Sequence, residues 1–121
     1  MIAAVLGASD NPERYSYQAV KLLGEKGHEV FPINPSLKEI DGLKVFSSLK
    51  GLPKSIHTLS IYLSKAVSSK LTGEILESKP KRIIFNPGAE NPELMAAASK
   101  NGIQAIEACT LVLLRTNQFE G

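Results

Sequence analysis

The sequence has few residues that could form disulfides or bind metals, and it has no long apolar segment for membrane insertion. It contains one cysteine and two histidines in 121 residues. A single cysteine excludes an internal disulfide, and so few Cys and His residues provide no metal-ligand spacing. No apolar run approaches the roughly 20 residues of a membrane-spanning helix, and no basic segment with a cleavage site opens the chain. We therefore expect a cytoplasmic protein with no metal site and no membrane partner.

The charge of the chain is also small. Fourteen basic and twelve acidic residues leave a net charge of +2, which is too little for the basic face that duplex nucleic acid requires. Hydrophobic residues make up 43% and charged residues 21%, both ordinary for a globular protein. A chain of this length can bury a sizeable core in one domain. We predict a single domain over residues 1–121 with a small-molecule partner.

Short apolar runs alternate with amphipathic segments along the chain. This alternation predicts an α/β protein with a Rossmann-like, doubly wound parallel sheet of about five strands in three layers. The first run, Ile2–Leu6, is continuously apolar, which is typical of a strand covered on both faces. We predict strands over 2–6, 28–35, 56–63, 82–85 and 103–106, and helices over 16–26, 65–78, 92–102 and 109–115.

Local signals refine this prediction. Pro32 lacks a backbone donor, which favours an edge strand, a bulge or a position late in the ladder. The Asp41-Gly42 dipeptide predicts a small hairpin, and residues 47–52 fit one helical turn. Ser64 is predicted to cap the helix over 65–78. Asn91 and Pro92 are predicted to begin the next helix.

The loop after the first strand has residues suited to phosphate. Gly7 lets the chain turn close to a ligand, and the following helix offers free N–H groups and a positive dipole end. Arg14 can hold two phosphate oxygens at once, with Ser9 and Ser16 beside it. In the alternative interpretation Gly7 makes a turn, Arg14 is a solvated charge and Ser16 caps a helix.

The loop departs from the dinucleotide fingerprint. That fingerprint requires Gly-x-Gly-x-x-Gly, with an acidic residue near the end of the second strand for the ribose hydroxyls. Here Ser9 and Pro12 stand where the second and third glycines would be, and the second strand ends at Ile33-Asn34-Pro35 without an acid. Both departures argue against NAD and leave open a ligand whose pyrophosphate is held differently.

The segment Gly7–Ser16 resembles the first loop of the stand-alone CoA-binding domain proteins. These small Rossmann-type proteins are similar to the CoA-binding domain of the succinyl-CoA synthetase α-subunit. The resemblance covers nearly the whole chain in order and continues at Val30–Pro35, Gly42–Leu49, Asn86–Ala89, Glu93-Leu94, Gly102-Ile103 and Glu107–Cys109.

The resemblance implies that the ligand is CoA or acyl-CoA. It implies that the first loop holds the CoA phosphates, that the end of the second strand and the following segment contact the adenosine, and that the end of the third strand lines the opposite wall. The implied residues are Gly7, Ala8, Ser9, Arg14 and Ser16 for the phosphates; Asn34, Pro35, Lys38 (for the ribose phosphate) and Val45 (for the adenine); and Tyr62, Leu63 and Lys65 for the wall.

No catalytic residues are assigned. His28 and His57 fall at strand amino ends, opposite the expected ligand edge. Cys109 has no adjacent basic group to lower its pKa and is expected to be a buried, inert thiol. A non-catalytic CoA-binding module is therefore favoured. Two alternatives stay open: a small NAD(P)-binding oxidoreductase-like or CoA-transfer enzyme, and an interaction subunit that binds no ligand.

The apolar segment Thr110–Leu114 has two interpretations. Its apolar residues lie too close together for a one-sided helical stripe. The segment either covers one edge of the sheet as core or pairs two chains as a homodimer.

Overall fold

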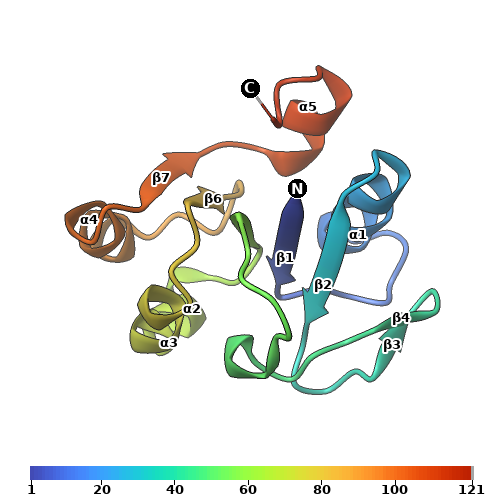
Figure 1. The fold of residues 1–121 in the computed structure, drawn as a ribbon, viewed down its shortest axis with the longest axis horizontal. Helices are drawn as coiled ribbons and strands as arrows, with labels where there is room; N and C mark the ends of the chain where they lie inside the picture. The colour runs from blue at the N-terminus through green and yellow to red at the C-terminus, as the bar shows by residue number, and fades with distance from the viewer. Residues whose placement is uncertain (121) are drawn as a thin grey trace.

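A five-stranded parallel sheet forms the centre of the computed structural model, which describes residues 1–120 (Figure 1). The predicted parallel, doubly wound sheet is confirmed. The chain places β2 outside β1 and then returns to the other side of β1, so the winding direction reverses between β1 and β5. In spatial order the strands are β2 (Glu29–Ile33), β1 (Ile2–Leu6), β5 (Thr58–Ile61), β6 (Arg82–Phe85) and β7 (Gln104–Glu107), all paired in parallel.

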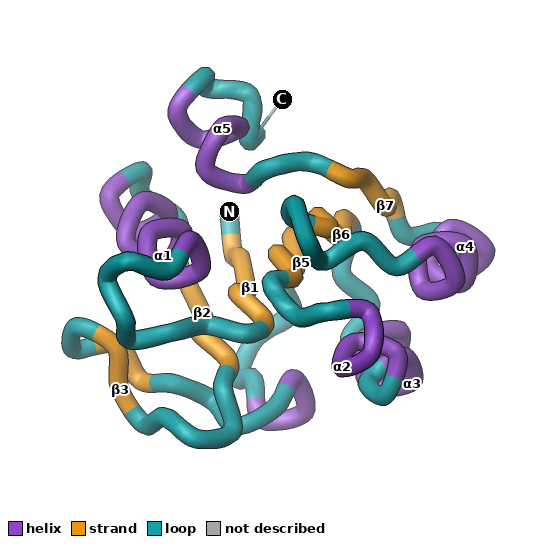
Figure 2. The backbone as a smooth tube through the Cα atoms, turned by 180° about the vertical axis from the view of Figure 1, so that it is seen from behind, coloured by secondary structure: helices purple, strands orange, loops and turns teal. Residues whose placement is uncertain are grey.

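Helices cover both faces of the sheet, which confirms the three layers. α1 (Tyr15–Glu25) and α5 (Thr110–Arg115) lie on one face. The other face carries α2 (Lys65–Ser69), α3 (Thr72–Glu77) and α4 (Pro92–Lys100) (Figures 1 and 2).

Successive residues of β1 reach opposite layers. Val5 packs in one core cluster with Leu23 of α1 and Leu114 of α5. Ala4 and Leu6 pack on the other face in the cluster that contains Leu94 of α4. Because both faces of β1 are buried, both sets of alternating side chains must be apolar.

Two local predictions are confirmed. Pro32 lies in β2, at the edge of the sheet, where its missing N–H costs no ladder hydrogen bond. Its carbonyl accepts a hydrogen bond from the amide of Phe46 at 2.9 Å. Asp41 and Gly42 both have positive φ, 48° and 83°, as the tight turn between β3 (Glu39–Ile40) and β4 (Leu43–Lys44) requires. A short 3₁₀ turn, η1 (Leu49–Gly51), follows.

The prediction of one helix over 65–78 is wrong. The segment forms α2 and α3, separated at Lys70 and Leu71, and the Ser64 hydroxyl makes no capping hydrogen bond. The Thr72 hydroxyl donates to the Ser69 carbonyl, a local bond that competes with a continuous helix. The other bounds differ from the prediction by a few residues at most: strand 56–63 is shorter, strand 103–106 begins one residue later, and helix 109–115 begins at Thr110.

The C-terminal segment is mainly core. Leu111 and Leu114 are buried, whereas Val112 is 53% exposed. This pattern supports the core interpretation for most of Thr110–Leu114. Pairing of two chains through the exposed part of α5 stays a prediction.

Acidification is expected to destabilise the fold through His28. Burial lowers the pKa of this residue, and the Met1 ammonium group, 2.9 Å from its Nδ1, adds to the effect. The unfolded chain therefore binds more protons below a pH of about 6.5, and the free energy of unfolding should fall as the pH drops.

We expect the urea midpoint to decrease between about pH 7.5 and about pH 5.5, above the range in which carboxylates titrate. His28→Gln should flatten this dependence. The pKa of His57 is also lowered, chiefly by burial, so the double variant with His57→Gln should be flatter still. A wild-type midpoint that does not change over this range would contradict the prediction.

Candidate nucleotide-binding site

An open cavity of about 580 Å³ lies where the carboxyl ends of β1, β2 and β5 meet. This position is the switch point of the sheet, where ligands of doubly wound proteins bind. The cavity brings together eight of the twelve predicted site residues. They are Gly7, Ala8, Ser9, Arg14, Ser16, Asn34, Tyr62 and Leu63, and Glu13 and Tyr15 complete the lining.

Gly7 allows the two strand ends to approach each other. Its φ is +89°, and a Cβ at this position would lie 2.8 Å from Leu63 Cδ2 and 3.3 Å from the carbonyl carbon of Tyr62. The amides of Gly7 and Ala8 both donate to the Ile33 carbonyl at 3.1 Å. These two amides hold the loop to β2, so they are not the free donors of the cavity.

Hydrogen bonds within the loop set its path toward α1. Ser9 Oγ accepts from the amide of Asn11 at 3.0 Å, and Asn11 Oδ1 accepts from the amide of Glu13 at 3.0 Å. Asn34 connects the loop to the end of β2, because its Nδ2 donates to the Ala8 carbonyl at 2.8 Å. These hydrogen bonds lie within the chain and fix the shape of the cavity wall.

The first turn of α1 offers unshared donors to the cavity. Arg14 occupies the N-cap position, where no side chain caps the helix, and the first turn contains no acidic residue. Within residues 1–120, no acceptor contacts the amides of Tyr15, Ser16 and Tyr17. Such amides, together with the helix dipole, favour an anion. Ser16 lies inside the helix and is buried, so the interpretation of Ser16 as the helix cap is wrong.

The charged groups at this turn are exposed. Arg14 and Glu13 are both exposed and both line the cavity. Within the described part of the chain, the Arg14 guanidinium forms no salt bridge. Its donors are therefore available for a bidentate contact with phosphate.

Tyr62 forms a largely apolar part of the wall. Its hydroxyl is buried and makes no hydrogen bond within residues 1–120, although the hydroxyls of Ser60 and Thr110 lie nearby. Burial raises the pKa of Tyr62 to about 12, so the phenol is neutral at physiological pH. Tyr62 therefore adds no negative charge to the cavity.

Four predicted site residues do not line the cavity. Pro35 and Lys38 are exposed beyond the end of β2, and Val45 is buried in the same core cluster as Ile40. Lys65 is exposed and paired with Glu93. Their roles toward a ligand stay predictions.

Glu13 and Tyr15 are cavity residues that the sequence analysis did not single out. Both belong to the segment Gly7–Ser16, so their position in the loop was visible in the sequence. Which of the consecutive side chains in this segment face the cavity depends on the bend of the loop, for which the sequence has no signal.

The two histidines and the cysteine do not line the cavity. His28 and His57 immediately precede β2 and β5, at the edge opposite the cavity. Cys109 is half-buried, so the expectation of a buried thiol is wrong. No cluster of metal-ligating side chains occurs within residues 1–120. The longest helix there, α1, has 11 residues, and none of the described helices could cross a bilayer.

The parallel sheet and the helices on both of its faces define a Rossmann-like α/β protein. Residues 2–115 match the family model described as CoA binding domain. The chain therefore belongs to the CoA binding domain family, as the resemblance implied.

Two curated relatives show the range of this similarity. The chain is 29% identical over 99 residues to the uncharacterized protein YneT of Bacillus subtilis, covering 82% of this chain and 73% of YneT. It is 26% identical over 125 residues to the alpha subunit of an ADP-forming acetate–CoA ligase (II) of Pyrococcus furiosus. That match covers 94% of this chain and only 27% of the ligase subunit.

Solved structures show the same fold over nearly the whole chain. An uncharacterized protein of known structure is 35% identical, with a TM-score of 0.87 and coverage of 98% of this chain and 97% of that one. A Thermus thermophilus protein is 26% identical, with a TM-score of 0.90 and coverage of 98% and 90%, respectively.

Proposed function

We propose that the protein binds CoA or acyl-CoA in the cavity at the switch point and that it does so as a non-catalytic module. The observation that carries this proposal is the first turn of α1, where Tyr15 and Ser16, with unshared amides, and Arg14, with an unpaired guanidinium, all line one cavity. The pyrophosphate of CoA is the group that this arrangement suits. Membership of the CoA binding domain family supports the same ligand.

The end of β2 favours CoA over NAD. A carboxylate there would accept hydrogen bonds from the ribose hydroxyls of NAD, but the residue at this place is Asn34. Its Oδ1 accepts from the amide of Ser36 at 2.7 Å, and its Nδ2 donates to the Ala8 carbonyl. An amide already engaged in this way is a poor substitute for the acid.

The distribution of titratable groups supports a binding role without catalysis. General acid–base chemistry requires a group with a suitable pKa within hydrogen-bond reach of the reacting atom. The titratable residues that line the cavity are Glu13, Arg14, Tyr15 and Tyr62. Arginine stays protonated and burial raises the pKa of Tyr62 to about 12, so neither is suited to proton transfer near neutral pH. Glu13 is the one carboxylate among the lining residues, and no histidine or second carboxylate of the described chain lines the cavity to form an acid–base pair with it.

Arg14→Ala is expected to weaken CoA binding about tenfold to a hundredfold, because hydrogen bonds to charged groups are worth about 1.5–3 kcal/mol. Isothermal titration calorimetry of both proteins with CoA would measure the change. Arg115→Ala is the matched control. Arg115 is an exposed arginine in the last turn of α5, and its loss should leave the Kd unchanged.

Parallel titrations separate the alternatives. Tight binding of NAD without binding of CoA would contradict the proposal and favour an oxidoreductase-like protein. Binding of neither nucleotide would favour an interaction subunit without a ligand. Conversion of an acyl-CoA by the purified protein, followed by mass spectrometry, would contradict the non-catalytic role. Weaker binding of dephospho-CoA than of CoA would support a cation such as Lys38 at the ribose phosphate.

A further inference from the structure

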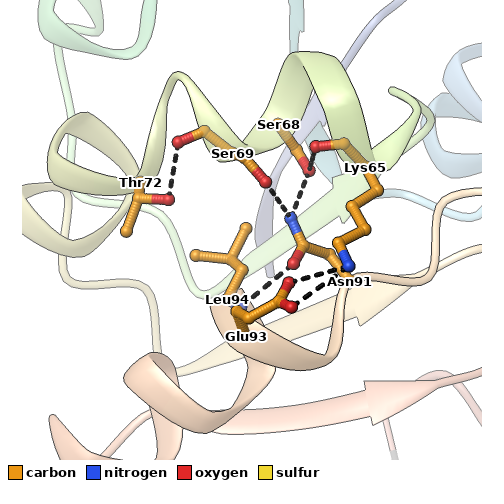
Figure 3. A network of polar contacts seen from close by, with 7 residues as sticks. All are labelled: Lys65, Ser68, Ser69, Thr72, Asn91, Glu93 and Leu94. Atoms are coloured by element: carbon orange, nitrogen blue, oxygen red, sulfur yellow. Dashed lines mark hydrogen bonds and ion pairs between the residues drawn. The ribbon is translucent and has the colours of Figure 1, made fainter.

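A polar network joins the end of α2 to the start of α4 (Figure 3). Its centre is Asn91, which is 1% exposed. Asn91 Nδ2 donates to Ser68 Oγ at 2.9 Å and to Ser69 Oγ at 3.1 Å. Asn91 Oδ1 accepts from the amide of Leu94 at 3.1 Å and so caps α4. The network holds the two helices in a defined relative position.

One consequence of this arrangement is an exposed ion pair between the first turns of the two helices. Lys65 Nζ lies 3.1 Å from Oε1 and 3.0 Å from Oε2 of Glu93. The side chains are 52% and 72% exposed, respectively. Hydrogen bonding and charge attraction from Lys65 lower the pKa of Glu93, so the carboxylate is ionised near neutral pH.

The location of Lys65 connects this ion pair with the cavity. Lys65 begins α2 only two residues after Leu63, which lines the cavity wall. Glu93 supplies the negative charge that compensates the Lys65 ammonium group. A phosphate group would supply the same compensation.

We infer that Glu93 sets the affinity of the site by holding Lys65 in an ion pair that a phosphate of CoA must replace. The inference rests on the proposed CoA-binding function. Exposed ion pairs are weak, corresponding to a factor of about five in an equilibrium constant at most, so the exchange is accessible. The flexible stem of lysine allows its ammonium group to move from Glu93 to a phosphate. Glu93 is thus a positioning residue that acts through Lys65.

Glu93→Gln removes the competing charge and leaves a side chain of similar size. We expect its Kd for CoA to be about two- to fivefold lower than that of the wild type, and Lys65→Ala to raise the Kd. In the Lys65→Ala background, Glu93→Gln should have no effect, because there is no lysine to release. The gain should also shrink when the salt concentration is raised from about 0.05 M to about 0.5 M.

Two controls separate this role from a structural one and from general charge repulsion. The melting temperature of the ligand-free protein should be nearly the same in all variants. A lower melting temperature with an unchanged Kd would show that the pair only stabilises the fold and would overturn the inference. Glu107→Gln removes an equal charge from an exposed residue at the carboxyl end of β7. It should leave the Kd unchanged, and a gain equal to that of Glu93→Gln would overturn the inference.

The failure of this inference is distinguishable from the failure of the proposed function. If the wild type binds CoA and Arg14→Ala weakens binding while Glu93→Gln does not strengthen it, only the role of Glu93 is wrong. If the wild type does not bind CoA, the proposed function itself fails.

Discussion

Gly7→Ala is expected to lower the free energy of unfolding by about 2–4 kcal/mol and to weaken nucleotide binding strongly. An L-residue at φ +89° costs about 1–2 kcal/mol. The new Cβ would also lie 2.8 Å from Leu63 Cδ2, 3.2 Å from Leu63 Cγ and 3.3 Å from the Tyr62 carbonyl carbon. The Leu63 side chain must therefore turn away, and the Tyr62 backbone must move by a few tenths of an ångström, both at the cavity wall. Urea denaturation and calorimetry with CoA would measure the two effects.

Variants of two other glycines distinguish the cost of the positive φ from the cost of the close contacts. Gly88 also has a positive φ, +90°, but a Cβ there would meet nothing within 4 Å. Gly88→Ala should therefore show the backbone cost alone, about 1–2 kcal/mol. Gly24 lies in α1 with open space around it, and Gly24→Ala should stabilise the protein by up to about 1 kcal/mol. Equal losses for Gly7→Ala and Gly88→Ala would contradict the close approach of the two strand ends.

Asn86→Ala is expected to have an effect of similar or larger size, about 3–5 kcal/mol. Asn86 is 1% exposed and follows β6. Its Nδ2 donates to Ser60 Oγ and to the Ile61 carbonyl, each at 2.9 Å. Its Oδ1 accepts from the amide of Thr110 at 2.8 Å. Alanine would leave a cavity and remove partners from three buried polar groups.

Urea denaturation would measure this loss, and Asn101→Ala is its matched control. Asn101 is exposed, and its amide donates to the Ala97 carbonyl, so its loss should cost well under about 1 kcal/mol. Because Asn86 connects β5, β6 and the start of α5, its variant should also loosen the cavity wall at Tyr62. A loss for Asn86→Ala no larger than that for Asn101→Ala would show that water replaces the amide.

The chain belongs to the CoA binding domain family. The chain spans 27% of the acetate–CoA ligase subunit that it resembles, so the activity of that larger protein does not transfer to this chain. Most of α5 packs within the chain, but Val112 is exposed. A homodimer through Val112 stays a proposal, and sedimentation of the purified protein would test it.

The sequence by itself determined the elements whose signals are local. Apolar side chains at every position of β1 require a strand covered on both faces. In the structure β1 lies inside the sheet, between β2 and β5, with helices on both faces. Asn91 followed by Pro92 caps α4, and Asp41-Gly42 turns the hairpin, because each signal depends on the φ or the hydrogen bond of the residue itself. The loop after β1 was likewise predictable, since Gly7 and the helix that follows are adjacent in the chain.

Only the tertiary structure decided which side chains are free to meet a ligand. Lys65 was predicted at the site, but Glu93 from another helix holds it in an ion pair. Val45 is buried in the core, and its contact with adenine stays a prediction. The helix predicted after Ser64 is divided in two, next to the contacts that Asn91 makes with Ser68 and Ser69. Each of these outcomes depends on residues more than 20 positions apart or on core packing, and local spacing contains no information about such contacts.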